Sequence, residues 1–428
     1  MKIFIGLTDV AGYYTNLKKG FDELGVKSVF VNLGGHPFEY GGDDTQNILI
    51  KLRKSVTAKL ASTHRSSIFL KVLWRALRQI LWTVLFAWAI LRYDVFIFGY
   101  KSSFLSFYDL PILKFFKKKV IYIFHGSDSR PPYIDGSIMS MNGGLTVEDC
   151  INLTRKQKNT LKRIERYADI IIGNPLSSHL HEKPVIVVQI IGIPFKCDKD
   201  NRINAEFRHN HGIRILHSPS NPEGKGTSRI RKAIKSLQAK GHPLEFVEIT
   251  GKSNTIVLNE LANCDFVIDQ LYSDTPMAGL ATEAAFFGNP TIVGGYGQAE
   301  IRRIFPADKM PLVFFCHPDE IEKAIEKLIM DEKYRMELGR KVKQFVETNW
   351  APKKVARRYL QLIKGNIPED WLYDPKDISY LNGCGLPEYR SKELIKSVIE
   401  RGGKEALQLS DKPDLERMFV EFARGDGS

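Results

Sequence analysis

The sequence predicts an α/β fold of two Rossmann-like domains, whose parallel sheets face one another across a cleft, followed by a C-terminal extension. The chain has 428 residues, of which 43% are hydrophobic, enough for two domains of about 200 residues that each bury a core. Short apolar runs alternate with amphipathic stretches, as they do in the β-α-β units of a parallel sheet. A charged stretch in the middle of the chain separates two such series.

The first series predicts the N-terminal domain, residues 1–195. Its apolar runs predict strands near 2–7, 28–33, 94–99, 119–124, 169–173 and 185–191. Its amphipathic stretches predict helices near 14–24, 68–92, 104–117, 146–167 and 176–181.

The second series follows a predicted linker, residues 196–212, in which apolar residues are scarce. It predicts a C-terminal domain of residues 213–350, with strands near 213–217, 244–249, 265–269, 290–294 and 311–315. The helices are expected near 226–239, 255–262, 280–287, 318–330 and 332–348. A further helix at 352–364, within the segment 351–364, is predicted to cross back to the N-terminal domain. The extension, residues 365–428, is rich in Pro, Gly and charges, and no chemistry is assigned to it.

The N-terminus and the cysteines limit the possible locations and cofactors. No apolar stretch of signal-peptide length follows a charged start, so a cytoplasmic protein is expected. The five cysteines lack a Cys-x-x-Cys pair, which favours buried free thiols over a zinc site or a disulfide framework. The Asp-x-Asp sequence Asp198-Lys-Asp200 lies in the linker and is interpreted as a solvated turn, so no metal and no other cofactor is expected.

Residues 271–293 are the segment most indicative of function. A polar loop runs into Gly279 and a helix of small residues that carries one acid, Glu283. Glycine lets main-chain N–H groups approach a ligand, and a helix N-terminus favours negative charge. Glu283, one turn further on, could hold a ribose or sugar hydroxyl. This pattern is suited to a nucleotide sugar.

Two other loops contain candidate site residues. Lys225 and Gly226 lie where a loop meets a helix, and a lysine there suits the oxygens of a diphosphate, although a solvated lysine would look the same. His125 follows a strand, where imidazole could donate to a sugar oxygen or accept a proton, or bond only its own loop. Asp128 and Arg130 could pair with each other or reach a substrate on the acceptor side. Gly12, after the first strand, could leave room for a ligand or only relax a turn.

Several motifs resemble the retaining GT-B glycosyltransferases of family 4. On the donor side the likeness is carried by His217-Ser-Pro-Ser-Asn with Lys225-Gly-Thr, Cys264-Asp-Phe-Val-Ile-Asp-Gln270 and Gly279-Leu-Ala-Thr-Glu-Ala-Ala-Phe-Phe-Gly-Asn-Pro290. On the acceptor side it is carried by Phe124-His-Gly-Ser-Asp128 and Tyr167-Ala-Asp-Ile-Ile-Ile172. The likeness covers about residues 1–364.

The resemblance implies a role for each matching residue. Lys225 would bind the diphosphate, the main chain of Gly279 and Leu280 would meet the phosphate or the sugar, and Glu283 would hold the ribose. The family's usual arginine before the lysine has no counterpart in Asn221–Gly224. Thr275 stands where the family has a second acid, and the neighbouring Asp274 is the candidate replacement. His125, Glu283 and Asp274 are therefore the candidate catalytic residues.

The resemblance implies transfer of a sugar from a nucleotide-diphosphate sugar to a glycan or lipid-linked acceptor, with retention and without a metal, in the synthesis of a polysaccharide or glycolipid. The departing phosphate oxygen would take the acceptor's proton. The missing arginine and the displaced acid leave open a catalytically silent GT-B partner protein in a membrane-associated complex. A sugar-nucleotide epimerase is a third reading.

A basic, tryptophan-rich stretch indicates contact with a membrane surface. Residues 51–119 contain 14 Lys and Arg against two Asp, a net charge of +12 out of +13 for the chain. Lys71, Arg75 and Arg78 share a helical face near Trp74, and the uncharged run that follows is too short to span a bilayer. Such a helix can lie on anionic lipid at the inner face of the plasma membrane, or be buried with a solvated basic edge. No nucleic-acid-binding motif accompanies these residues.

Overall fold

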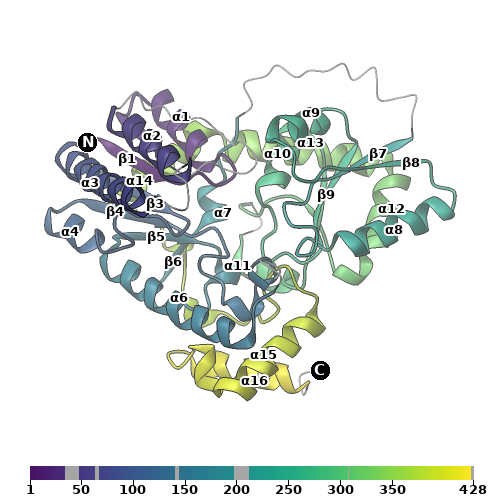
Figure 1. Cartoon of the computed structure of the whole chain (residues 1–428). Helices are drawn as coiled ribbons and strands as arrows, with labels where there is room; N and C mark the ends of the chain where they lie inside the picture. The colour runs from purple at the N-terminus through teal and green to yellow at the C-terminus, as the bar shows by residue number, and fades with distance from the viewer. Residues whose placement is uncertain (34–47, 63–66, 140–143, 197–211, 307, 426–428) are drawn as a thin grey trace.

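Two parallel β-sheets, one in each half of the chain, form the centres of two domains (Figure 1). The computed structural model describes residues 1–33, 48–62, 67–139, 144–196, 212–306 and 308–425. The predicted fold class is confirmed, because both sheets are covered by helices on both faces and an extension follows the second domain.

The N-terminal sheet has the strand order β12-β6-β5-β4-β3-β1-β2. Its strands are β1 (Ile3–Leu7), β2 (Ser28–Asn32), β3 (Val95–Gly99), β4 (Lys119–Ile123), β5 (Ile170–Gly173), β6 (Val185–Val187) and β12 (Leu372–Tyr373). All pairs are parallel except β12, which runs antiparallel to β6. β1 and β3 are buried at every position, as expected of strands covered on both faces.

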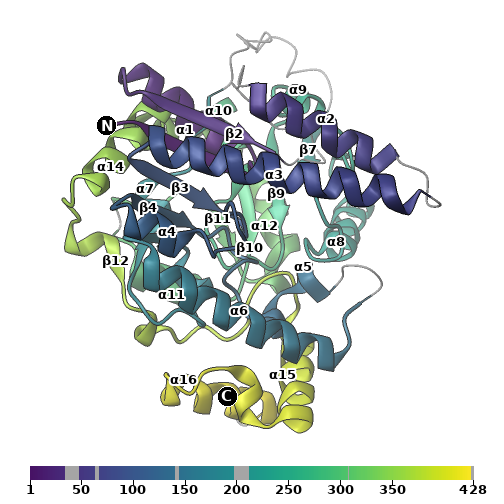
Figure 2. The same cartoon turned by 60° about the vertical axis from the view of Figure 1, so that its left-hand side comes forward.

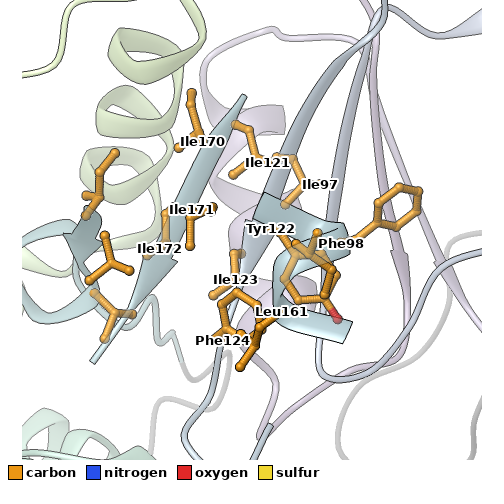
Figure 3. Packing of buried hydrophobic residues seen from close by; sticks show 14 of the residues in the cluster. Ile97, Phe98, Ile121, Tyr122, Ile123, Phe124, Leu161, Ile170, Ile171 and Ile172 are labelled. Carbon is orange, nitrogen blue, oxygen red and sulfur yellow. The ribbon is translucent and has the colours of Figure 1, made fainter. Parts of the chain in front are cut away.

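Helices cover both faces of this sheet (Figure 2). One face carries α1 (Tyr13–Glu23) and α14 (Pro352–Ile363), and the other carries α3 (Ile68–Arg92), α4 (Leu110–Phe115) and α6 (Val147–Tyr167). α14 lies against α1 because residue 20 is glycine, where a Cβ would be only 2.1 Å from the carbonyl oxygen of Pro352. Branched and aromatic side chains of β3, β4 and β5 pack with Leu161 of α6 into one core (Figure 3).

The C-terminal sheet has the strand order β11-β10-β9-β7-β8, and all its pairs are parallel. Its strands are β7 (Ile213–His217), β8 (Leu244–Glu248), β9 (Phe266–Gln270), β10 (Thr291–Gly294) and β11 (Phe314–Cys316). α8 (Thr227–Ala239) and α12 (Ile321–Met330) pack together on one face. α9 (Asn254–Leu261), α10 (Gly279–Phe287) and α13 (Glu332–Asn349) pack on the other. α11 (Gln298–Ile304) connects β10 to β11.

Three predicted elements of the first half are shorter than expected. The helix predicted at 104–117 is only α4, because the Asp109 carboxylate accepts hydrogen bonds from Ser103 and from the backbone N–H of Phe104, which hold a turn there. The strand predicted at 185–191 ends at Val187, and the short helix α7 (Val188–Ile191) follows. The helix predicted at 176–181 is one 3₁₀ turn, Pro175–Ser177.

The C-terminal extension belongs structurally to the N-terminal domain. It adds β12 to the edge of the sheet, and α15 (Glu388–Gly402) packs against α6 and α16 (Pro413–Arg424) (Figures 1 and 2). The helix α2 (Ile48–Ser62) packs along α3. Of the predicted linker, residues 197–211 lie outside the described ranges, and with them Asp198, Asp200 and Cys197; the other four cysteines are free thiols.

Candidate functional site

The strand order points to the carboxyl ends of β7 and β9 as the candidate ligand site. The order of the C-terminal sheet reverses between these two strands, and ligands of open α/β sheets bind where such a reversal opens a crevice. A cavity of about 230 Å³, called here the Lys225 cavity, lies there. Val10 and Ala11 of the N-terminal domain close the cavity. The rest of its lining comes from residues near the ends of β7, β8 and β9 and from the start of α10: Ser218, Pro219, Ser220, Lys225, Ile249, Gly251, Lys252, Asn254, Val257, Asp269, Ala278, Gly279 and Leu280.

The Lys225 side chain is held in position by the end of β9. Its Nζ donates to Asp269 Oδ1 at 2.9 Å and to Gln270 Oε1 at 2.7 Å. The carboxylate of Asp269 is buried, while Lys225 keeps 19% of its side chain exposed. The ammonium group is therefore a fixed positive charge that faces the cavity, as required to bind a phosphate.

The start of α10 contributes main-chain N–H groups to the same cavity. The helix begins at Gly279, and none of the described side chains caps it. A Cβ on Gly279 would lie 3.3 Å from Cβ of Ala11, so glycine permits the close approach of the two domains here. An uncapped helix N-terminus favours an anion.

Glu283 lies one turn into α10 and only 2% of it is exposed. Its Oε1 accepts a hydrogen bond from Asn254 Nδ2 at 3.0 Å, and Asn254 lines the Lys225 cavity. Asn254 therefore lies between the Glu283 carboxylate and the Lys225 cavity. Asn254, the first residue of α9, was not predicted as a site residue, because no motif in the sequence marks it.

A second cavity, called here the His125 cavity, lies beside the first. It measures about 350 Å³ and shares Val10, Ala11, Ser220, Ala278 and Gly279 with the Lys225 cavity. The His125 ring lies edge-on to those of Tyr13 and Tyr14, and its Nε2 is 2.9 Å from the Tyr14 hydroxyl. Burial lowers the pKa of His125 to about 4, so the imidazole is neutral at pH 7. It can exchange hydrogen bonds with a sugar in that form.

Asp128 shapes the loop that presents His125. Its Oδ1 accepts a hydrogen bond from the backbone N–H of His125 at 2.8 Å. Burial raises the pKa of Asp128 to about 6. Asp128 is not among the described residues that line the two cavities. The pairing of Asp128 with Arg130, one of the two predicted alternatives, is wrong, because Arg130 has other partners.

Arg130 binds two carboxylates, Asp135 of its own domain and Asp274 of the C-terminal domain. Its Nε donates to Asp274 Oδ2 at 2.8 Å and its Nη1 to Asp135 Oδ2 at 2.7 Å, and all three residues are buried. The neighbouring Thr275 hydroxyl accepts a hydrogen bond from Gln189 of the N-terminal domain at 2.8 Å. Asp274, the candidate replacement for the second acid, thus has one carboxylate oxygen engaged by Arg130.

Two predicted glycines have conformational roles. Gly226 precedes α8 at φ 73°, and a Cβ there would lie 2.7 Å from Leu271 Cβ. Gly12 precedes α1, also at φ 73°, while its neighbours Val10 and Ala11 line the cavities. Both positions need glycine for a left-handed backbone. Within the described part of the chain, no group of three or more His, Cys, Asp or Glu could hold a metal ion.

The basic stretch forms one long helix, α3, on the outside of the N-terminal domain (Figure 2). One side of its second half is buried, as at Leu85 and Phe86, whereas its first half exposes apolar side chains such as Phe69, at 79%. Arg75 is exposed, and Lys71, Trp74 and Arg78 are partly exposed. None of the helices within the described ranges is long and apolar enough to cross a membrane.

No protein-family model and no curated protein matches the chain. Among solved structures, it is similar to Anabaena HepE in complex with UDP-glucose, at 11% identity and a TM-score of 0.47 over 85% of this chain and 99% of that one. It is also similar to the glycosyltransferase SnogD from Streptomyces nogalater (12%, 0.39, 84% and 99%) and to OtsA without ligand (9%, 0.49, 86% and 100%).

Proposed function

We propose that the chain is a glycosyltransferase that moves a sugar from a nucleotide-diphosphate sugar to a glycan or lipid-linked acceptor in polysaccharide or glycolipid biosynthesis. The observation that carries the proposal is the Lys225 cavity, where a fixed ammonium group and the uncapped start of α10 converge at the switch point of a parallel sheet. A diphosphate fits this arrangement, and the adjoining His125 cavity offers room for the transferred sugar.

The proposed reaction proceeds with retention and needs no dedicated protein base. The bond between the sugar C1 and the diphosphate oxygen breaks, and a bond between C1 and the acceptor oxygen forms on the same face of the ring. The acceptor's proton passes to the departing phosphate oxygen. Lys225 and the N–H groups of Gly279 and Leu280 stabilise the charge that develops on the diphosphate. Neutral His125 orients the sugar through a hydrogen bond, and no metal is needed for the charge balance that we propose.

The test is a panel of nucleotide sugars incubated with the purified full chain, with release of nucleoside diphosphate as the readout. Glycosyl transfer predicts release that rises when a suitable acceptor is added. An epimerase would change the donor sugar without releasing the nucleotide. If no donor binds or reacts, with or without lipid acceptors, the enzyme proposal is wrong.

A catalytically silent partner protein is the second candidate. The bond from Arg130 to Asp274 favours it, because it engages the acid that would replace the family's second carboxylate. This reading predicts nucleotide-sugar binding at most, with no turnover of any donor. Isothermal titration calorimetry on the same panel separates binding from turnover.

We also propose that the protein is cytoplasmic and binds the inner face of the plasma membrane through α2 and α3. The exposed apolar side chains at the start of α3 adjoin a basic surface, to which α2 adds Arg53 and Lys59. These two cations lie over the rings of Trp82 and Trp74, at 3.9 and 5.1 Å from the ring centroids. Apolar insertion and attraction to anionic lipid would then act on the same surface.

Flotation with anionic vesicles at low and high salt tests the membrane proposal. Replacing Ile68 and Phe69 with Ser should weaken binding, and high salt should weaken it further. Met330→Ser is the control, since Met330 is 69% exposed on the C-terminal domain. Equal flotation of the control and the double variant would contradict the proposal.

A further inference from the structure

A third cavity, called here the Tyr296 cavity, lies on the other side of the loop that carries Lys225. It measures about 700 Å³, within the range of roughly 300–1,000 Å³ of small-molecule sites. Glu223 and Gly226 of this loop line the Tyr296 cavity, whereas Lys225 lines the Lys225 cavity. The two cavities are therefore separate spaces at one sheet edge.

The C-terminal extension forms one wall of the Tyr296 cavity. The backbone N–H of Gly136 donates to the Cys384 carbonyl at 2.8 Å, and the N–H of Gly385 donates to the Tyr272 carbonyl at 2.8 Å. A Cβ on Gly136 would lie 2.0 Å from the Gly385 carbonyl oxygen, so the close approach requires glycine. The extension thus touches both domains and encloses a space that neither domain forms alone.

Four aromatic side chains are among the described residues that line this cavity: Tyr272, Tyr296, His317 and Tyr389. The rings of Tyr272 and Tyr296 are stacked, with centroids 6.3 Å apart and planes at 16°. His317 lies edge-on to Tyr296 at 5.3 Å, and Tyr389 at the rim is 63% exposed. The C–H faces of sugar rings pack against such aromatic faces, which combine apolar area with a polar edge.

The charges that line the cavity favour a neutral ligand. Among the described residues that line it, two arginines, Arg229 and Arg390, stand against three carboxylates, Glu223, Asp319 and Glu388, a net charge of −1. The described lining of the Lys225 cavity contains two lysines and one carboxylate, a net charge of +1. A diphosphate is repelled by the first set and attracted by the second. Sugar hydroxyls both donate and accept, so they match a mixed set of guanidinium and carboxylate groups.

We propose that the Tyr296 cavity binds a neutral oligosaccharide, separately from the nucleotide-sugar site. The cavity volume accommodates more than one sugar ring, and the rim at Tyr389 lets a longer chain leave toward solvent. The identification of this glycan as the acceptor rests on the proposed function. The binding of a glycan in the cavity does not depend on it.

The test measures glycan binding directly, with the full chain and an array of neutral and acidic oligosaccharides, followed by calorimetry. Neutral oligosaccharides should bind, and Tyr389→Ala should weaken their binding by about tenfold. Tyr108→Ala is the matched control, because Tyr108 is 64% exposed on the N-terminal domain, away from the cavity. Tyr389→Ala should leave nucleotide-sugar affinity unchanged, and Lys225→Met should leave glycan affinity unchanged.

Three outcomes would overturn the inference: no binding of any neutral oligosaccharide at millimolar concentration, preferential binding of acidic glycans, or binding that Tyr389→Ala does not weaken. Failure of donor turnover with intact glycan binding would contradict only the proposed transfer. Donor turnover without glycan binding would contradict only the Tyr296 cavity as a glycan site.

Discussion

His125 is enclosed by tyrosine rings, and its surroundings determine its protonation. The Tyr14 hydroxyl lies 2.9 Å from Nε2, and burial lowers the pKa of the imidazole from 6.5 to about 4. A neutral imidazole cannot serve as a cationic acid near pH 7. It acts as a hydrogen-bonding group whose geometry is fixed by its neighbours.

We predict that His125 does not titrate between pH 5.5 and 8, because this range begins about 1.5 units above its folded pKa of about 4. NMR of histidine labelled at Cε1 measures this directly, and a midpoint above about pH 5.5 would contradict it. The unfolded chain binds a proton at His125 as pH falls through 6.5, while the folded chain does so only near pH 4. The stability that depends on His125 is therefore lost as pH falls from about 6.5 to 4, and His125→Gln should reduce this loss in urea unfolding.

Lys225 is expected to contribute a charged hydrogen bond to the donor diphosphate. Such bonds contribute about 1.5–3 kcal/mol, so Lys225→Met should weaken nucleotide-sugar binding by about tenfold to a hundredfold in calorimetry. Lys232→Met, at an exposed position of α8, is the control and should bind normally. Since Lys225 also pairs with buried Asp269, thermal unfolding must show that the variant is folded. Unchanged affinity would remove Lys225 from the site.

At the scale of the element, the start of α10 both lines the Lys225 cavity and contacts the N-terminal domain. We predict that Gly279→Ala weakens nucleotide-sugar binding, because the added Cβ lies 3.3 Å from that of Ala11 and pushes the loops apart. Ala11→Gly in the same chain should restore binding. Ala11 has φ 48°, a backbone that suits glycine, so the second substitution adds no strain. Calorimetry on the three variants checks this, and no recovery in the double variant would contradict it.

Most of the elements could be predicted because their patterns are local. Most strands of the two sheets read as apolar runs, since helices cover both faces, and the predicted strands appear within a few residues of their predicted positions. The exceptions depend on contacts outside the local pattern. Asp109 holds residues 103–105 in a turn, and β12 is a strand of two residues that exists only through its pairing with β6.

The same distinction applies to the site. Lys225 and Gly279 could be placed from the sequence, because a loop that leads into a helix start has a recognisable composition. The partnership of Arg130 with Asp274 could not, since 144 residues separate them and either could have faced solvent or substrate. Asn254 and the extension at Gly385 were missed for the same reason.

At the scale of the molecule, Arg130 stabilises the contact between the two domains through its ion pair with Asp274. Removing one partner of a buried ion pair leaves an uncompensated charge, which costs about 3–5 kcal/mol. Arg130→Met leaves two buried carboxylates, Asp135 and Asp274, without their cation. We therefore predict that the variant has a lower urea midpoint and a larger radius of gyration in small-angle scattering. Arg231→Met removes a surface ion pair with Glu248 and should change neither quantity. An unchanged Arg130→Met variant would contradict this role.

The antiparallel strand β12 has a consequence for the synthesis of the chain. β6 ends at Val187, but its partner begins at Leu372, 185 residues later. At about 5–20 residues per second, a ribosome needs roughly 10 to 40 s to make the intervening segment. Throughout that interval the nascent chain carries an open sheet edge, the kind of surface that pairs with other chains. The sheet of the N-terminal domain, which is synthesised first, is thus completed last. Its strand β12 is translated only after the entire C-terminal domain.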